Sequence, residues 1–516
     1  MPGRWYALAA GLALALVVAG CGGGGGGGNA GAGNPTSAYF DPALYSSAAG
    51  ASLSAASELV STTRHQIVVN GTTLAYTAAA GHLTAKNLTS GAPEASFFYV
   101  AYTLDNKDPA TRPVTFFYNG GPGSSTVWLH LGSFGPKRLA TGSPATTASA
   151  PFPLVDNAES LLDVSDLVFV DAVGTGLSEA IAPNINQTFW SVDADAAVFR
   201  DFIVRYLGAN NRAGSPLFLF GESYGTTRSA VLAFLLAMAG VHVNGVILQS
   251  TILNYNASCG VVTPGVSCAG YLPSYGAIGA WYNLDVPNPD NAALPQFVAQ
   301  MRTFASNDYD PAVVHFLAAG LPPSPALLTQ LSSTTGVPVL KWQTHFNLGP
   351  DYFQANLLPG VLIGRYDARV SAPFGSPLAR EGDPSSTFIT PSFVGAIGAY
   401  LSSELQYTNP SAYATTSNAI DAWSFAHDGV ALPDVVPDLA AAMALNPKLQ
   451  VLALNGYHDL ATPFFQTERD LARLGAQPNI TATFYRGGHM TYLDDGARLS
   501  EKADLVQFFQ RAAAAQ

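Results

Sequence analysis

Short apolar runs bounded by turn residues recur along this chain and predict buried strands. Two of these runs are rich in aromatic and β-branched residues, which favour strands. Others are continuous apolar runs, typical of parallel strands that are covered on both faces. We expect strands at Ser96–Tyr102, Val114–Tyr118, Asp166–Val170, Pro216–Phe220, Gly245–Leu248, Leu449–Leu454 and Ile480–Tyr485.

Helical spacing of apolar residues appears between these runs. It predicts helices at Ala194–Leu207, Thr226–Leu236, Phe465–Leu474 and Leu499–Ala513. Strands that alternate with helices indicate a doubly wound, mostly parallel sheet, an α/β fold.

The pattern loosens between about residues 250 and 433, where Pro, Asn, Ser and Tyr become frequent. We interpret this stretch as an insertion, a largely helical cap between the two halves of the sheet. The expected organisation is therefore a core formed by residues 60–250 and 434–516, with a cap at residues 251–433.

The first residues form a separate segment. Arg4 precedes an uncharged apolar stretch, Trp5–Gly20, which is too short to span a bilayer and suits a signal peptide over residues 1–20. The sequence Val18-Ala-Gly-Cys21 resembles the lipobox of bacterial lipoproteins, which implies a lipid on Cys21. Seven glycines follow, so residues 21–59 are expected to form the lipidated N-terminus and a flexible linker.

The expected location is thus the cell envelope, periplasmic or at the outer surface, with the lipid as the sole membrane contact. A plain secretory peptide with an incidental cysteine is the alternative.

Composition narrows the class of protein. The chain has 516 residues, 48% of them hydrophobic and only 11% charged, with a net charge of −12. A large core is therefore available, and disorder driven by charge is excluded for most of the chain. The acidic balance and the lack of a basic run argue against nucleic acid as a partner.

Two cysteines remain if Cys21 carries lipid. Cys259 and Cys268 are nine positions apart, and an exported compartment would permit a disulfide between them. Two free thiols are the alternative.

The pattern Gly-x-Ser-x-Gly occurs at Gly221–Gly225, between an apolar strand and an apolar helix. In this context the serine lies on a sharp turn where larger neighbours would collide. Ser223 is therefore our candidate nucleophile, and it needs a base to accept its proton.

The base and its acidic partner are expected on loops after late strands. In α/β-hydrolases the chain order is Ser, then Asp or Glu, then His. Asp459 follows the strand that ends at Leu454, and His489 follows the strand that ends at Tyr485. His489 is the only histidine after Asp459, so these two residues are selected. His458 adjoins Asp459, but neighbouring side chains diverge and we do not choose it as the base.

Two backbone N–H groups must stabilise the oxyanion. One normally comes from the residue after the nucleophile, here Tyr224. The other comes from a glycine-rich loop after an early strand, here Asn119–Ser125, where glycine allows close approach to the substrate.

Several motifs resemble those of the serine carboxypeptidases, in the order found in that family. They are Asn119-Gly-Gly-Pro-Gly-Ser-Ser125, Phe134-Gly-Pro136, Asp171-Ala-Val-Gly-Thr-Gly-Leu-Ser178, Gly221-Glu-Ser-Tyr224, Gly456-Tyr-His-Asp459 and Gly488-His-Met490.

This resemblance implies an α/β-hydrolase fold with a cap and the removal of C-terminal residues from peptides. It implies a Ser223–Asp459–His489 triad with oxyanion donors at Gly121 and Tyr224. It also implies that Asn119, Gly120 and Glu222 bind the free carboxylate of the peptide. Neither a cofactor nor a metal is expected.

Glu222 can bind another carboxylate only while it keeps a proton. Many family members carry an acidic residue shortly before the Gly-Pro step, which helps to hold this proton, but this chain has Ser133 there. The departure puts a strongly acidic pH optimum in doubt and leaves the triad unchanged. A structural role for Glu222 at the start of the helix is the alternative.

Two other functions compete with a carboxypeptidase. An esterase or acyltransferase would use the same triad, because an acyl-enzyme can pass to water or to another alcohol. A non-catalytic binding protein that kept the fold is the second alternative.

Overall fold

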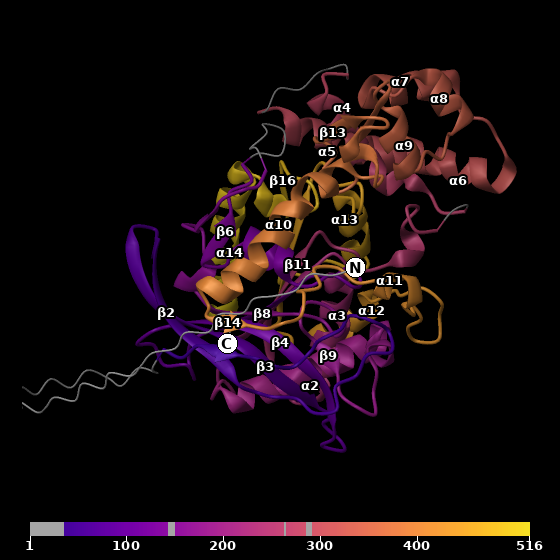
Figure 1. Cartoon of the computed structure of the whole chain (residues 1–516). Coiled ribbons are helices and arrows are strands. Elements are labelled where there is room, and N and C mark those ends of the chain that lie inside the picture. The colour runs from indigo at the N-terminus through magenta and orange to yellow at the C-terminus, as the bar shows by residue number, and fades with distance from the viewer. Residues whose placement is uncertain (1–35, 143–149, 263–264, 285–291, 516) are drawn as a thin grey trace, which may run out of the picture. The chain divides into compact units, whose positions relative to one another are not determined.

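The computed structural model describes residues 36–142, 150–262, 265–284 and 292–515, and a mixed ten-stranded sheet runs through them (Figure 1). From one edge to the other the order is β16-β15-β11-β10-β5-β8-β4-β3-β2, with β9 paired to β4. The strands are β2 (Val60–Val69), β3 (Thr72–Lys86), β4 (Pro93–Leu104), β5 (Val114–Tyr118), β8 (Asp166–Val170), β9 (Glu179–Ala180), β10 (Leu217–Glu222), β11 (Val243–Gln249), β15 (Gln450–Gly456) and β16 (Ile480–Tyr485).

Neighbouring strands from β16 to β8 are parallel, whereas β4, β3 and β2 continue the sheet in antiparallel pairs. The mostly parallel, doubly wound sheet predicted from the sequence is confirmed. Glu222 pairs with Gln249, and Gly456 pairs with Tyr485. The carboxyl ends of these strands therefore lie side by side along one boundary of the sheet, which we call its carboxyl edge. In α/β folds, ligands bind at this edge.

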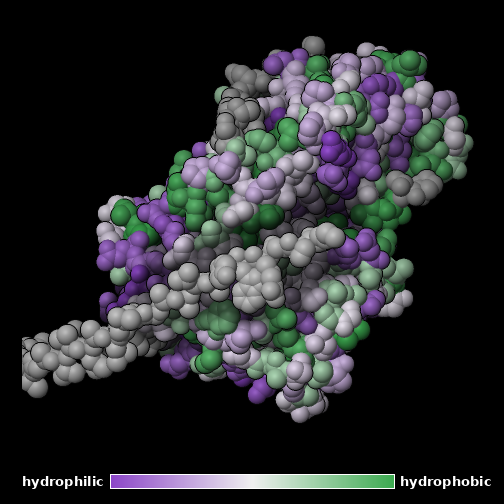
Figure 2. Space-filling model, viewed as in Figure 1, coloured by the Kyte–Doolittle hydropathy of each residue, from purple (hydrophilic) through white to green (hydrophobic). Residues whose placement is uncertain are grey.

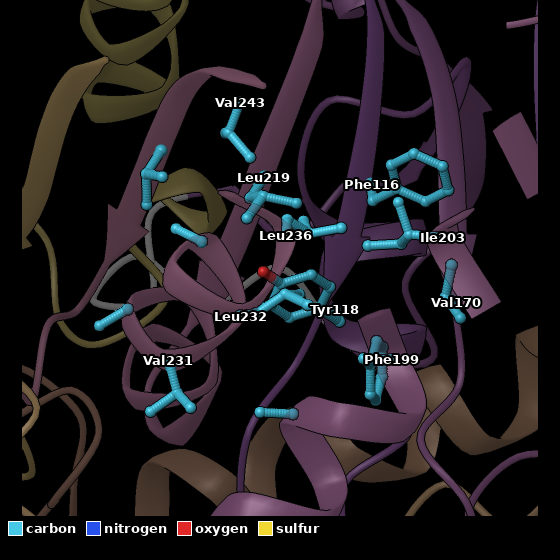
Figure 3. Packing of buried hydrophobic residues seen from close by; sticks show 14 of the residues in the cluster. Phe116, Tyr118, Val170, Phe199, Ile203, Leu219, Val231, Leu232, Leu236 and Val243 are labelled. Carbon is cyan, nitrogen blue, oxygen red and sulfur yellow. The ribbon is translucent and has the colours of Figure 1, made fainter. Parts of the chain in front are cut away.

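Helices cover both faces of the sheet because its strands are apolar on both sides. One face packs against α2 (Val192–Ala209), α3 (Tyr224–Met238) and α12 (Val436–Leu445). Figure 3 shows Phe116, Tyr118 and Leu219 of the strands against Phe199, Leu232 and Leu236 of the helices. The other face packs against α1 (Val127–Gly132), α10 (Pro384–Ser403) and α14 (Asp495–Ala514).

A helical segment with its own apolar core separates β11 from β15 in the sequence, as predicted. Its helices are α4 (Leu272–Trp281), α5 (Leu294–Phe304), α6 (Asp310–Ala319), α7 (Pro325–Thr335), α8 (Val339–Thr344) and α9 (Pro350–Asn356). Helix α10 also lies in the predicted cap, but Ile389 and Phe393 pack it on the sheet. The predicted boundaries at residues 251 and 433 stay predictions.

The other strands and α-helices of the described residues are short. They are β1 (Tyr39–Phe40) paired with β14 (Tyr407–Thr408), β6 (Lys137–Leu139) paired with β7 (Leu154–Asp156), β12 (Val361–Ile363) paired with β13 (Ser371–Pro373), and helices α11 (Ala419–Ala422) and α13 (Phe464–Ala472).

The prediction of a flexible linker over residues 21–59 is wrong for residues 36–59. Tyr39 pairs with Tyr407, and the buried Asp41 accepts hydrogen bonds from the hydroxyls of Tyr45 and Tyr407 at 2.9 and 2.7 Å. Tyrosines and an aspartate therefore hold this stretch against the rest of the described chain. The predicted signal peptide and the predicted lipidation site at Cys21 lie outside the described residues.

Hydrophobic and hydrophilic residues are interspersed over the face shown in Figure 2, in keeping with the low content of charged residues. None of the helices in the described part of the chain is both long enough and apolar enough to cross a membrane.

Candidate active site

Ser223 lies on a tight turn between β10 and α3, with φ 60° and ψ −127°. A positive φ is rare for a residue with a side chain and stores strain that its surroundings must support. The turn closes because glycine stands on either side. A Cβ at Gly221 would lie 2.2 Å from the carbonyl oxygen of Gly225, and one at Gly225 would lie 2.9 Å from that of Tyr118. The structure thus places Ser223 on the strained turn expected for a nucleophile.

His489 and Asp459 come together from the loops after β16 and β15. Nδ1 of His489 lies 2.8 Å from Oδ2 of Asp459. The other carboxylate oxygen of Asp459 accepts the backbone N–H groups of Ala461 and Thr462 at 2.7 and 3.1 Å. The hydroxyl of Thr462 also donates to Oδ2 at 2.7 Å. These bonds fix the carboxylate so that it orients the imidazole.

The electrostatics favour a charged imidazole. Burial disfavours the charged form of His489, but the carboxylate of Asp459 outweighs burial and raises the pKa of His489 above its ordinary value. Asp459 is fully buried and His489 is 3% exposed. A base held in this way can take a proton from a nearby hydroxyl.

Ser223 and His489 line the same cavity of about 100 Å³ at the carboxyl edge of the sheet, together with Glu222. His458, by contrast, is buried near Trp281, with ring centroids 6.0 Å apart. The structure therefore brings the candidate nucleophile and His489 to one place. A larger groove of about 880 Å³, lined by Pro216 and Leu217, lies at the opposite ends of the strands, away from these residues.

The glycine-rich loop after β5 packs directly on the N-terminus of α3. A Cβ at Gly120 would lie 2.5 Å from the backbone nitrogen of Tyr224. Gly121, with φ 104°, lines the cavity beside Ser223. Both predicted oxyanion donors, the N–H groups of Gly121 and Tyr224, thus belong to segments that meet at the nucleophile.

Asn119 and Glu222 form a buried polar pair beside Ser223. The Asn119 side chain donates from Nδ2 to Oε1 of Glu222 at 2.8 Å, while its Oδ1 accepts the N–H of Leu129 at 3.0 Å. The Asn119 amide also donates to the Tyr492 hydroxyl. The other oxygen of Glu222, Oε2, accepts the Tyr492 hydroxyl at 2.5 Å.

The pKa of Glu222 is raised to about 7, above its ordinary value. Burial is the largest cause, and His489, the Tyr492 hydroxyl and the Asn119 amide act in the opposite direction. Glu222 is therefore neutral for a substantial fraction of the time near neutral pH, as the binding of a carboxylate requires.

Ser133 stands where many family members have an acidic residue, and its hydroxyl donates to the carbonyl of Leu129 at 2.6 Å. The hydroxyl that reaches Glu222 instead belongs to Tyr492, which the sequence reasoning missed. Tyr492 follows His489 by three residues, so its proximity to the site could have been suspected from the His489 motif.

Arg228 was also missed, although a charged residue in an apolar helix is a signal of a buried ion pair. It is fully buried on α3 and bonds Asp195 through Nε at 2.6 Å. Its Nη1 donates to the backbone carbonyl of Asn119 at 2.8 Å. Arg228 therefore ties the loop that carries Asn119 to the helix that follows Ser223.

The rest of the cavity comes from distant parts of the chain and presents both apolar and hydroxyl-bearing side chains. It is lined by Trp128, Tyr366, Ile389 and Met490, together with Ser124, Ser386 and Thr416. The Tyr366 ring lies 4.9 Å from the His489 ring, and its carbonyl accepts the His489 N–H at 2.5 Å. No local motif marks Trp128, Tyr366 or Ile389, which explains why the sequence did not identify them, whereas Met490 belongs to the Gly488-His-Met490 motif.

Cys259 and Cys268 are joined by a disulfide in this structure. Away from the site, His427, Asp428 and Asp438 offer ligand atoms within 4.8 Å of one another. His427 already bonds Asp193 and Asp438 through its two nitrogens, at 2.6 and 3.0 Å. Ion pairing accounts for this group.

Residues 70–237 match the model of the family described as serine carboxypeptidase. No curated protein matches the chain. Similar solved structures include juvenile hormone epoxide hydrolase from the silkworm Bombyx mori, with 12% identity over 85% of this chain and 79% of that chain and a TM-score of 0.35. Bromoperoxidase from Bacillus anthracis has 14% identity over 84% and 100%, with a TM-score of 0.36.

These TM-scores are low, and the fold class rests on the strand order and on the order of Ser223, Asp459 and His489 along the chain. The match to the serine carboxypeptidase family thus covers about a third of the chain, residues 70–237, and the chain is a serine hydrolase of the α/β-hydrolase fold.

Proposed function

We propose that this protein is a serine carboxypeptidase that releases C-terminal residues from peptides. The observation that carries the proposal is the buried Asn119–Glu222 pair in the cavity of Ser223. A raised pKa lets Glu222 carry a proton, so it can donate to the carboxylate of a peptide beside the Asn119 amide. A hydrolase that acts on neutral esters has no need of such a pair.

The reaction would follow the chemistry of an activated serine. Ser223 attacks the carbonyl carbon of the last peptide bond while His489 accepts the proton of the Ser223 hydroxyl. The N–H groups of Gly121 and Tyr224 stabilise the oxyanion that forms. His489 then gives the proton to the leaving amine. Water, deprotonated by His489, attacks the acyl-enzyme, and Ser223 is restored when the ester breaks.

A matched pair of peptides tests the proposal. One peptide has a free C-terminus, and the other is the same peptide with a C-terminal amide. We expect the free form to be cleaved at its last bond and the amidated form to be cleaved at least about tenfold more slowly, because it cannot form the charge-assisted bonds of a carboxylate. Equal rates would refute capture of the carboxylate. Cleavage of simple esters with no peptide hydrolysis would favour an esterase or acyltransferase.

We also propose that the chain is exported and held at the cell envelope by a lipid on Cys21. The support is the sequence Val18-Ala-Gly-Cys21 after an apolar segment. Cys21→Ser should move the protein from the membrane fraction to the soluble fraction. A variant that stays in the membrane fraction would refute the anchor.

A further inference from the structure

Gln249, the last residue of β11, contacts both the nucleophile and the base. Its backbone carbonyl accepts the N–H of Ser223 at 2.9 Å. Its side-chain amide donates to the Thr491 hydroxyl at 2.9 Å and lies 3.4 Å from the carbonyl oxygen of His489. One residue thus links the turn that carries the nucleophile to the loop that carries the base.

Ser250 adds a second link to the same carbonyl. Its hydroxyl donates a short hydrogen bond to the carbonyl oxygen of His489. Its own N–H donates to Leu454, at the end of β15, at 2.7 Å. Ser250 has a φ of 51°, a conformation that side-chain-bearing residues rarely adopt and that tends to persist where surroundings enforce it.

The network continues away from the cavity into the last helix. The Thr491 hydroxyl donates a hydrogen bond to Oε2 of Glu501 on α14 at 2.8 Å. Gln249, Ser250, Thr491 and Glu501 are all fully buried. Because water does not compete in such a place, each hydrogen bond restricts its partners more than it would at the surface.

We propose that Gln249 and Ser250 are positioning residues that set the placement of the His489 backbone relative to Ser223. The inference rests on the proposed roles of Ser223 as nucleophile and His489 as base, but not on the carboxypeptidase activity. Asp459 orients the His489 ring, and Tyr366 fixes the N–H of the same residue. Gln249 and Ser250 fix its carbonyl, so the loop is held on both sides of the imidazole.

The expected effect follows from the sensitivity of proton transfer to distance. A misplacement of about 1 Å can slow a reaction by about 100-fold. Loss of one of two links to the His489 carbonyl should therefore slow acylation of Ser223 by about 10- to 100-fold. Substrate affinity should not change, because neither side chain lines the cavity of the described residues.

The test uses Gln249→Met and Ser250→Ala in the full chain. Methionine keeps the length of the side chain and leaves the backbone bond to Ser223 intact. Thr251→Val is the matched control, since the Thr251 hydroxyl is also buried in this turn but donates to Leu248 at 3.0 Å. The measurements are the second-order rate of labelling by an organophosphorus serine reagent, kcat and KM on an activated ester, and Tm.

We expect Gln249→Met and Ser250→Ala to lose about 10- to 100-fold in the labelling rate and in kcat, with KM unchanged. Thr251→Val should stay within about twofold of the unmodified protein. Unchanged labelling in both folded variants, or an equal loss in Thr251→Val, would overturn the proposal. A protein that labels but does not cleave peptides would refute only the carboxypeptidase function, whereas an unmodified protein that does not label would refute the role of Ser223 and this inference with it.

Discussion

The protonation of Glu222 makes a quantitative prediction about substrate binding. Burial raises its pKa from 4.5 to about 7, and only the neutral form can donate to a peptide carboxylate. At pH 8 a group with this pKa is about one-tenth protonated, and each further pH unit removes another factor of about ten. KM for a peptide with a free C-terminus should therefore rise about fivefold from pH 7 to pH 8 and about tenfold per pH unit above pH 8.

Glu222→Gln isolates this effect, because the amide has nearly the same shape and does not titrate. In this variant KM should be flat between pH 6 and 9. The unmodified protein should show the rise of KM with pH. The pH dependence of its kcat should instead report the titration of His489. The assay measures released amino acid over this pH range, and the amidated peptide serves as the control without a carboxylate. An unmodified KM that does not change with pH, or an equal rise in Glu222→Gln, would refute the reasoning.

The raised pKa of Glu222 also makes the stability of the folded state depend on pH. The pKa of Glu222 is raised on folding, so the folded state binds the proton more tightly and loses stability as pH rises from about 4.5 to about 7. The full difference between these values corresponds to about 3 kcal/mol. Glu222→Gln should remove this loss, so its Tm relative to the unmodified protein should increase with pH across that interval.

Three further outcomes are expected. Asp459→Asn should lower kcat by about 10⁴-fold, because His489 loses the charge that orients it, and an ester assay checks this. Tyr492→Phe removes a hydroxyl that lowers the pKa of Glu222, so the rise of KM should move to higher pH; an unmoved transition would contradict the assignment. The hydrogen bond that His427 donates to Asp438, opposed by burial and aided by a second carboxylate, raises the pKa of His427 to about 9. Stability from this group should be complete below pH 6.5 and lost as pH rises to about 9, and His427→Gln should abolish that part of the Tm dependence.

The strands that position the site could be predicted because a short apolar run between turn residues is typical of a buried strand. The strand at Ile480–Tyr485 has the bounds predicted from the sequence, and the one at Val114–Tyr118 does as well. The hairpin of β2 and β3 was not predicted, because Thr72–Lys86 is dominated by Ala and Thr and carries no continuous apolar run. Pairing with β4 on one side and β2 on the other stabilises it instead.

The candidate site also has a part that could be predicted from the sequence and a part that could not. Ser223, Asp459 and His489 were selected because each follows a strand in the required order, and the structure gathers them at one edge of the sheet. Tyr366 and Ile389 reach the cavity from the segment between the sheet halves, at positions that only the folded chain defines. Local sequence does not encode such contacts, because they depend on how the insertion returns to the sheet.

The most direct test of the account is the identity of the residue that an organophosphorus reagent modifies. Mass spectrometry of the labelled protein should find one adduct, on Ser223. The adduct should be absent in Ser223→Ala and form at least about 100-fold more slowly in His489→Gln, because the hydroxyl then lacks its base. An adduct on another residue, or undiminished labelling of Ser223→Ala, would contradict the central claim that His489 activates Ser223.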